Sequence, residues 1–346
     1  MGHLPYNREE ERRMMQLYER RIPGMLLAGI GLCLVLFAMG QIPAPGLAAE
    51  PEPATESMTL PPATEQQTKE PETTVPPGNW EAVEEMDGSH IFVYDCTEDA
   101  MLYCSGDSRD SLYPASITKL FSAWVALQYL QPEQKIQAGR ELGLLQPGSS
   151  TAYIAYGSVL TAQMLVEGML LPSGNDAAYV LAAAAGRVLL QDEKAGAARA
   201  VEAFVEEMNR QAEDLGLTGT HFENPDGYHS DGHYSCPRDL AVMGVLALEN
   251  EIIARYARCR SDSVRFASGE TCTWSNTNRL LNPESDYYCP AAIGLKTGHT
   301  KQGGYCLLAA FETAEEPVIV GIFGAESKLS RYADAVTLMQ LAEGEG

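Results

Sequence analysis

Basic side chains are scarce in this sequence of 346 residues. Lys and Arg together number 24, whereas Asp and Glu number 47, which gives a formal net charge of -23. Such a chain would be repelled by the phosphates of a nucleic acid rather than neutralise them. It would also not be attracted to an anionic lipid surface. The composition therefore excludes nucleic acid as a partner and argues against loose adsorption on acidic membranes.

Metal-binding signatures are missing as well. The sequence contains no Cys-x-x-Cys and no His-Glu-x-x-His pattern, and it has no internal repeat. His221, His229 and His233 form a dense cluster with Asp226 and Asp231, but Gly and Pro residues interrupt it. This composition favours a solvated loop over a metallopeptidase site. We expect neither a metal nor another cofactor.

Charge is absent from the stretch Met25 to Gly40, which follows two arginines. This pattern predicts a signal anchor over residues 25–43 and a cytoplasmic segment over residues 1–24. The protein would then be a single-pass cell-membrane protein whose folded domain lies outside the cytoplasm. The alternative is a signal peptide cleaved near Ala48, which would release a secreted protein.

Large apolar residues are rare in the next segment, where Pro, Thr and Glu dominate. A segment of this composition cannot form a core, so residues 44–85 are predicted to be a disordered linker. The folded domain would span residues 86–346.

Cysteine is present in an odd number outside the apolar stretch. Seven of the eight cysteines lie there, so at least one thiol stays unpaired. Cys272 and Cys289 are a plausible disulfide, because disulfides are permitted outside the cytoplasm. Cys306 is expected to be a small buried apolar residue.

Three short motifs occur in a fixed order: Ser116-Ile-Thr-Lys119, Ser173-Gly-Asn175 and Lys296-Thr-Gly298. A Ser and a Lys three positions apart on a helix share one face, so that the hydroxyl can be a nucleophile and the amine its base. Each motif alone is a weak signal. Their combination is strong, because each also sits in a fitting local pattern of helix start, helix junction or strand.

With their flanking residues, these motifs resemble the serine D-alanyl-D-alanine carboxypeptidases, the low-molecular-mass penicillin-binding proteins. The resemblance covers roughly residues 86 to 343. The matching segments are Pro114–Leu120, Leu171–Ala177, Asn224–Gly227, Gly294–Thr300 and Arg331–Asp334.

The resemblance implies a hydrolase of cell-wall synthesis. Such an enzyme removes the terminal D-Ala from peptidoglycan stem pentapeptides through an acyl-enzyme, and it binds penicillin and other β-lactam antibiotics covalently. Three alternatives stay open: a β-lactamase, a D,D-endopeptidase that uses the same site, and an inactive wall-binding module. The Gly of Ser173-Gly-Asn175 favours the carboxypeptidase over a class A β-lactamase, which has Asp there.

The resemblance also implies roles for individual residues. Ser116 would be the nucleophile, Lys119 the general base, Ser173 a proton relay, and Asn175 would position Lys119 and the substrate amide. The substrate would be bound by Lys296, Thr297, Gly298, Thr300 and the backbone N–H of His299, the last as part of an oxyanion hole.

Strand patterns occur at both ends of the folded region, with mostly helical patterns over residues 115–215 between them. This order predicts an α+β fold, an antiparallel sheet flanked by helices with an inserted helical subdomain. The resemblance implies the β-lactamase and penicillin-binding-protein type of transpeptidase fold.

Overall fold

The structure is a computed structural model that describes residues 80–313 and 317–344. The predicted cytoplasmic segment, the predicted anchor and most of the predicted linker lie outside these residues. No helix within the described ranges is long and apolar enough to cross a membrane.

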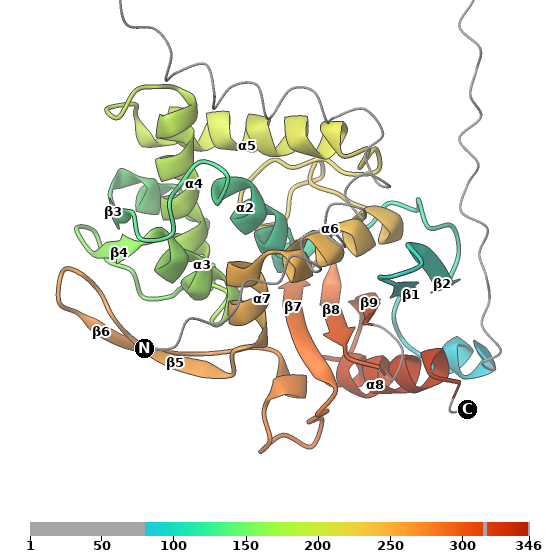
Figure 1. The fold of residues 1–346 in the computed structure, drawn as a ribbon. Helices are drawn as coiled ribbons and strands as arrows, with labels where there is room; N and C mark the ends of the chain where they lie inside the picture. Colours follow the sequence, from blue (N-terminus) through green and yellow to red (C-terminus); the bar gives the residue numbers. More distant parts are fainter. Residues whose placement is uncertain (1–79, 314–316, 345–346) are drawn as a thin grey trace, which may run out of the picture. The chain divides into compact units, whose positions relative to one another are not determined.

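A five-stranded antiparallel sheet joins the two ends of the folded region (Figure 1). Its strands lie in the order β2-β1-β9-β8-β7. Their bounds are β1 His90–Asp95, β2 Ala100–Cys104, β7 Ala292–Thr300, β8 Gly304–Phe311 and β9 Val318–Ala325. The first strand pairs with the last along its whole length, from His90 opposite Phe323 to Asp95 opposite Val318. The predicted α+β class is confirmed.

The two faces of the sheet are covered by different helices. Alternate side chains of a strand point to opposite faces of the sheet. Accordingly, Phe92 and Tyr94 belong to the core beneath α6 (Pro237–Glu249). Val93, between them, belongs to the core beneath α8 (Ser330–Ala342). The strands are therefore apolar on both faces, because neither face meets water.

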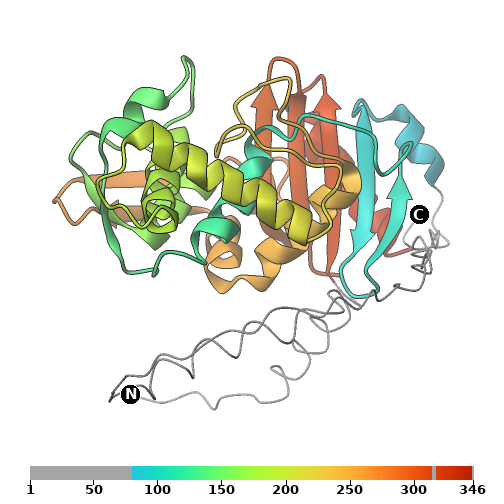
Figure 2. The same ribbon diagram turned by 90° about the horizontal axis from the view of Figure 1, so that it is seen from above.

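The helical subdomain is formed by most of the chain between β2 and β7, α6 excepted, and it lies beside the sheet (Figure 2). Its helices are α2 Thr118–Ala126, α3 Ala162–Leu170, α4 Asn175–Leu189, α5 Ala197–Asp214 and α7 Glu251–Arg258. Thr161 caps α3 as its sequence position suggests, since its hydroxyl accepts a hydrogen bond of 3.3 Å from the Met164 N–H.

Short elements complete the subdomain, and several of them were not expected from the sequence. They are the hairpin β3–β4 (Lys135–Gln137 and Val159–Thr161), the hairpin β5–β6 (Ser261–Arg265 and Thr271–Ser275), and the 3₁₀-helices η3 Ala115–Ile117, η4 Arg140–Leu144 and η5 Arg279–Leu281. Strands of three to five residues carry too little periodicity to be recognised in a sequence.

Two sequence predictions need correction. Residues Trp80–Glu85, predicted as the end of the linker, form the 3₁₀-helix η2: Val83 is buried in the core beneath α8, and the Trp80 ring stacks on Tyr103. The predicted disulfide is wrong, because Cys272 and Cys289 are both free thiols. The two residues belong to separate cores, one on the helical side and one beneath α8.

Candidate active site

Ser116 lies where the helical subdomain meets β7. It is the second residue of η3, which leads directly into α2, and the residue before it, Ala115, has a left-handed φ of +49°. Two glycines allow the surrounding backbone to come close. A Cβ on Gly227 would lie 1.8 Å from the Ala115 carbonyl oxygen, and a Cβ on Gly298 would lie 3.1 Å from the Ser116 nitrogen. The backbone around Ser116 is therefore fixed by direct contact with two distant segments.

Lys119 is the partner of Ser116, as the spacing predicts. Its Nζ lies 2.8 Å from the Ser116 Oγ and donates a second bond of 2.7 Å to the backbone carbonyl of Asp226. The side chain is completely buried. Burial lowers the pKa of Lys119 to about 8, although the nearby carboxylates of Asp226 and Asp176 act to raise it. A substantial neutral fraction is therefore present at mildly alkaline pH.

Lys296 differs from its prediction in one respect. Its pKa is lowered well below the usual range, first by burial and then by the positive charges of Lys119 and Arg331. Its Nζ donates to the Thr297 carbonyl at 2.9 Å, and the side chain does not line the cavity in front of Ser116. The contact of Lys296 with a substrate carboxylate stays a prediction. Burial, not Lys296, is the main cause of the low pKa of Lys119.

The second motif borders the same cavity. Ser173 has a left-handed φ of +65°, and its carbonyl accepts a 2.6 Å hydrogen bond from the Ser150 hydroxyl. The Asn175 amide donates to the Ser149 hydroxyl at 3.1 Å. Its predicted bond to Lys119 is replaced by the Asp226 carbonyl bond. Asn175 thus holds the loop that carries Ser149 and Ser150.

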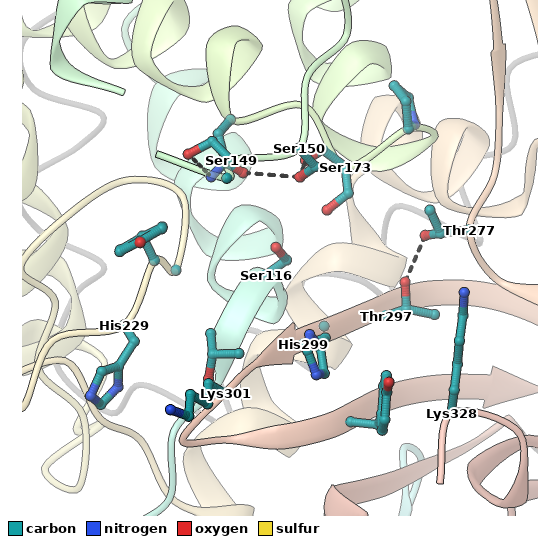
Figure 3. Close-up of a pocket in the computed structure, with 18 of the residues that line it drawn as sticks. Ser116, Ser149, Ser150, Ser173, His229, Thr277, Thr297, His299, Lys301 and Lys328 are labelled. Atoms are coloured by element: carbon teal, nitrogen blue, oxygen red, sulfur yellow. Dashed lines mark hydrogen bonds between the residues drawn. The ribbon is translucent and has the colours of Figure 1, made fainter. Parts of the chain in front are cut away.

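One cavity of about 990 Å³ collects most of the predicted site residues (Figure 3). The residues from the three motifs that line it are Ser116, Ser173, Asn175, Thr297, Gly298, His299 and Thr300 (His299 and Thr300 directly follow the third motif). The hydroxyls of Thr277 and Thr297 lie 2.6 Å apart at one side of this cavity. The cavity separates the helical subdomain from the outer strand of the sheet, β7, so an extended ligand can lie along that strand.

Arg331 contributes to the site in a way that the motifs did not indicate. Its guanidinium is buried and donates to the carbonyls of Gly298 at 3.0 Å and Cys306 at 2.6 Å. It also lies over the ring of Tyr305, on which the His299 ring stacks. Arg331 therefore fixes β7 and β8 where they border the cavity. No sequence pattern pointed to this contact, which joins α8 to the sheet.

Two members of the histidine cluster, His221 and His233, contact other protein groups through their ring nitrogens. His233 is buried with its Nε2 2.9 Å from the Thr118 hydroxyl, and burial lowers its pKa to about 3. The Nδ1 of His221 lies 2.7 Å from the Gly232 carbonyl. Within residues 80–313 and 317–344, no three His, Cys, Asp or Glu side chains are grouped so that they could hold a metal ion.

Comparison with known proteins gives a consistent result. A sequence model of the family described as D-alanyl-D-alanine carboxypeptidase matches residues 77–327. The chain is 29% identical over 241 residues to D-alanyl-D-alanine carboxypeptidase DacF of Bacillus subtilis (strain 168), and the match covers 68% of this chain and 57% of that relative. It is 31% identical over 244 residues to the D-alanyl-D-alanine carboxypeptidase of Streptomyces sp. (strain K15), covering 68% of this chain and 79% of the relative.

A solved structure shares the fold. The crystal structure of the Streptomyces K15 DD-transpeptidase aligns with a TM-score of 0.67 at 28% sequence identity, and the alignment covers 75% of this chain and 98% of that one.

Proposed function

Because the chain belongs to the D-alanyl-D-alanine carboxypeptidase family, we propose that it is a serine peptidase that cleaves the terminal D-Ala-D-Ala bond of peptidoglycan stem peptides. The same acyl-enzyme chemistry would let it bind penicillin covalently. The observation that carries this proposal is the 2.8 Å contact between a buried Lys amine and the Ser116 hydroxyl, at the floor of a cavity bordered by β7.

In the first step, neutral Lys119 takes the proton of Ser116 as the Oγ attacks the carbonyl carbon of the penultimate D-Ala. The negative charge that develops on the carbonyl oxygen is stabilised by the backbone N–H groups of Ser116 and His299. Their segments are adjacent, since Gly298 packs against the Ser116 nitrogen. The proton then passes through the Ser173 hydroxyl to the nitrogen of the leaving D-Ala, and the C–N bond breaks.

In the second step, water attacks the acyl-enzyme, with Lys119 again accepting a proton. The alcohol of Ser116 is released and the shortened peptide leaves. The substrate's terminal carboxylate would lie beside the hydroxyls of Thr297 and Thr277, with Thr300 contributing along the same strand. Gly298 is required because β7 approaches the nucleophile so closely that a side chain would collide with it.

Substitution of Ser116 tests the proposal. Ser116→Ala should abolish both the covalent penicillin adduct and the release of D-Ala from an acyl-D-Ala-D-Ala peptide, while the circular dichroism spectrum stays unchanged. Mass spectrometry of the wild-type adduct should place the modification on Ser116. An adduct on another residue, or D-Ala release by the Ser116→Ala variant, would refute the assignment.

The apolar stretch outside the described residues completes the proposal. Residues 25–43 would anchor the protein in the cell membrane with the catalytic domain outside the cytoplasm, where peptidoglycan lies. Fractionation of cells that make the full chain separates this arrangement from a secreted form. Recovery of the protein in the membrane pellet supports the anchor, and a shortened protein in the culture medium supports signal-peptide cleavage.

A further inference from the structure

The cavity in front of Ser116 has a charge balance opposite to that of the chain. Asp and Glu outnumber Lys and Arg by 47 to 24 in the sequence, yet no Asp or Glu lines the cavity. Its lining includes four basic side chains: Arg279, Lys301, Lys328 and Arg331. An electropositive cavity in a strongly acidic protein concentrates anionic ligands, because the rest of the surface repels them.

The cations lie on both sides of the nucleophile. In Figure 3, Lys328 lies on the side of Thr297 and Thr277, and Lys301 lies on the opposite side of Ser116. The proposed position of the terminal carboxylate, beside Thr297, uses only the first side. Lys301 is exposed and has no ion pair with any residue that the structure describes. Its charge is therefore left for a second anionic group.

The length of β7 indicates which part of a peptide would reach Lys301. Gly298 packs against Ser116, and Lys301 follows three residues later, directly after the end of β7. At about 3.3 Å per residue, this places Lys301 about 10 Å along the strand from the reacting carbonyl. An extended peptide that runs beside β7 covers this distance with its penultimate residue and the long side chain of the residue before it.

We propose that Lys301 forms a second anion subsite, which selects peptides whose third residue from the C-terminus has a side chain that ends in a carboxylate rather than an ammonium group. This rests on the proposed function, because it assumes that the terminal carboxylate lies at Thr297. Two acidic residues, Glu326 and Asp231, lie near the proposed subsite. Glu326 lines a neighbouring hollow together with Lys301, and Asp231 lies 3.5 Å from the Nε2 of His229. Neither lines the main cavity.

Three synthetic peptides that differ only in one terminal group test the proposal. Each is acetyl-Lys-D-Ala-D-Ala, with the lysine amine free, acetylated or succinylated, so that the side chain ends in an ammonium, a neutral or a carboxylate group. The wild-type kcat/KM should increase in that order, by about two- to fivefold at each step, as expected for an exposed ion pair. The preference should shrink when the salt concentration is raised from 20 mM to 500 mM, because exposed charges are screened.

Variants assign the preference to one side chain. Lys301→Gln should reduce the ratio of kcat/KM for the carboxylate peptide over the ammonium peptide by at least threefold, and Lys301→Glu should reverse it. Lys135→Gln is the matched control, since Lys135 is an exposed lysine of β3 that does not line the cavity, and it should leave the ratio unchanged.

The outcomes separate the two proposals. Equal kcat/KM for the three peptides, or an undiminished ratio in Lys301→Gln, refutes the second subsite while D-Ala release and the penicillin adduct on Ser116 still support the proposed function. Absence of that adduct in the wild-type protein refutes the proposed function itself.

Discussion

The acylation rate should depend on pH through Lys119. Its pKa is lowered from 10.5 to about 8 by burial, which corresponds to about 3 kcal/mol by which the fold disfavours the ammonium form. Only the neutral amine can accept the Ser116 proton. The neutral fraction is about one-tenth at pH 7 and about nine-tenths at pH 9. Activity should therefore be lost as the pH falls through 8.

The assay is the second-order rate constant for labelling by a fluorescent penicillin between pH 6 and 9.5. We expect a slope near one in a plot of log rate against pH below the midpoint, a plateau above it, and about a tenfold increase from pH 7 to pH 9. Circular dichroism at each pH checks that the protein stays folded. A rate that is independent of pH over this range would refute the role of Lys119 as the base.

Asp226→Asn sharpens this test. The Asp226 carboxylate acts to raise the pKa of Lys119, so its removal should move the midpoint below pH 8. The backbone carbonyl that accepts from Lys119 is retained in this variant, and the Asn side-chain oxygen can still accept from the Tyr228 N–H as Asp226 does. A midpoint that stays in place or rises would refute the electrostatic effect of the Asp226 carboxylate on Lys119.

Three further predictions concern the supporting residues. Gly227→Ala should lower the free energy of unfolding by about 2 kcal/mol or more, because Gly227 has a φ of +78° and a Cβ there would collide with the Ala115 carbonyl. An unchanged urea midpoint would contradict this. Arg331→Lys should slow penicillin labelling, since one ammonium cannot reproduce the guanidinium bonds to Gly298 and Cys306, and wild-type labelling would show that these bonds do not position β7. Burial raises the pKa of Cys306 to about 11. Iodoacetamide at pH 8 should therefore modify this thiol only after denaturation. Peptide mapping that finds Cys306 alkylated in the native protein would refute its burial.

The parts of the site that the sequence predicted are those that local geometry determines. Ser116 and Lys119 are adjacent because they are three positions apart on one helical segment, and Thr161 caps α3 because its side chain reaches an N–H three positions further along the chain. The hairpin of β7 and β8 could also be recognised from two neighbouring apolar runs.

The remaining features depend on tertiary packing and leave no local signal. The second partner of Lys119 is a carbonyl 107 positions away, and a carbonyl can be supplied by any residue type. The resemblance implied that Lys296 binds the substrate, but only the packed structure shows that its side chain is buried and donates to the Thr297 carbonyl. The same holds for Arg331, whose partners are backbone oxygens of two strands.

The pairing of β1 with β9 also affects the order in which the protein can be assembled during synthesis. His90–Asp95 must wait until Val318–Ala325 has left the ribosome, more than 220 residues later, before it gains its second neighbour. Bringing together two strands so far apart in the sequence costs more conformational entropy than forming local helices. Docking of β1 is therefore expected to be a late and slow event. A nascent chain truncated before residue 318 would keep the nucleophile and its base but lack the middle strand of the sheet.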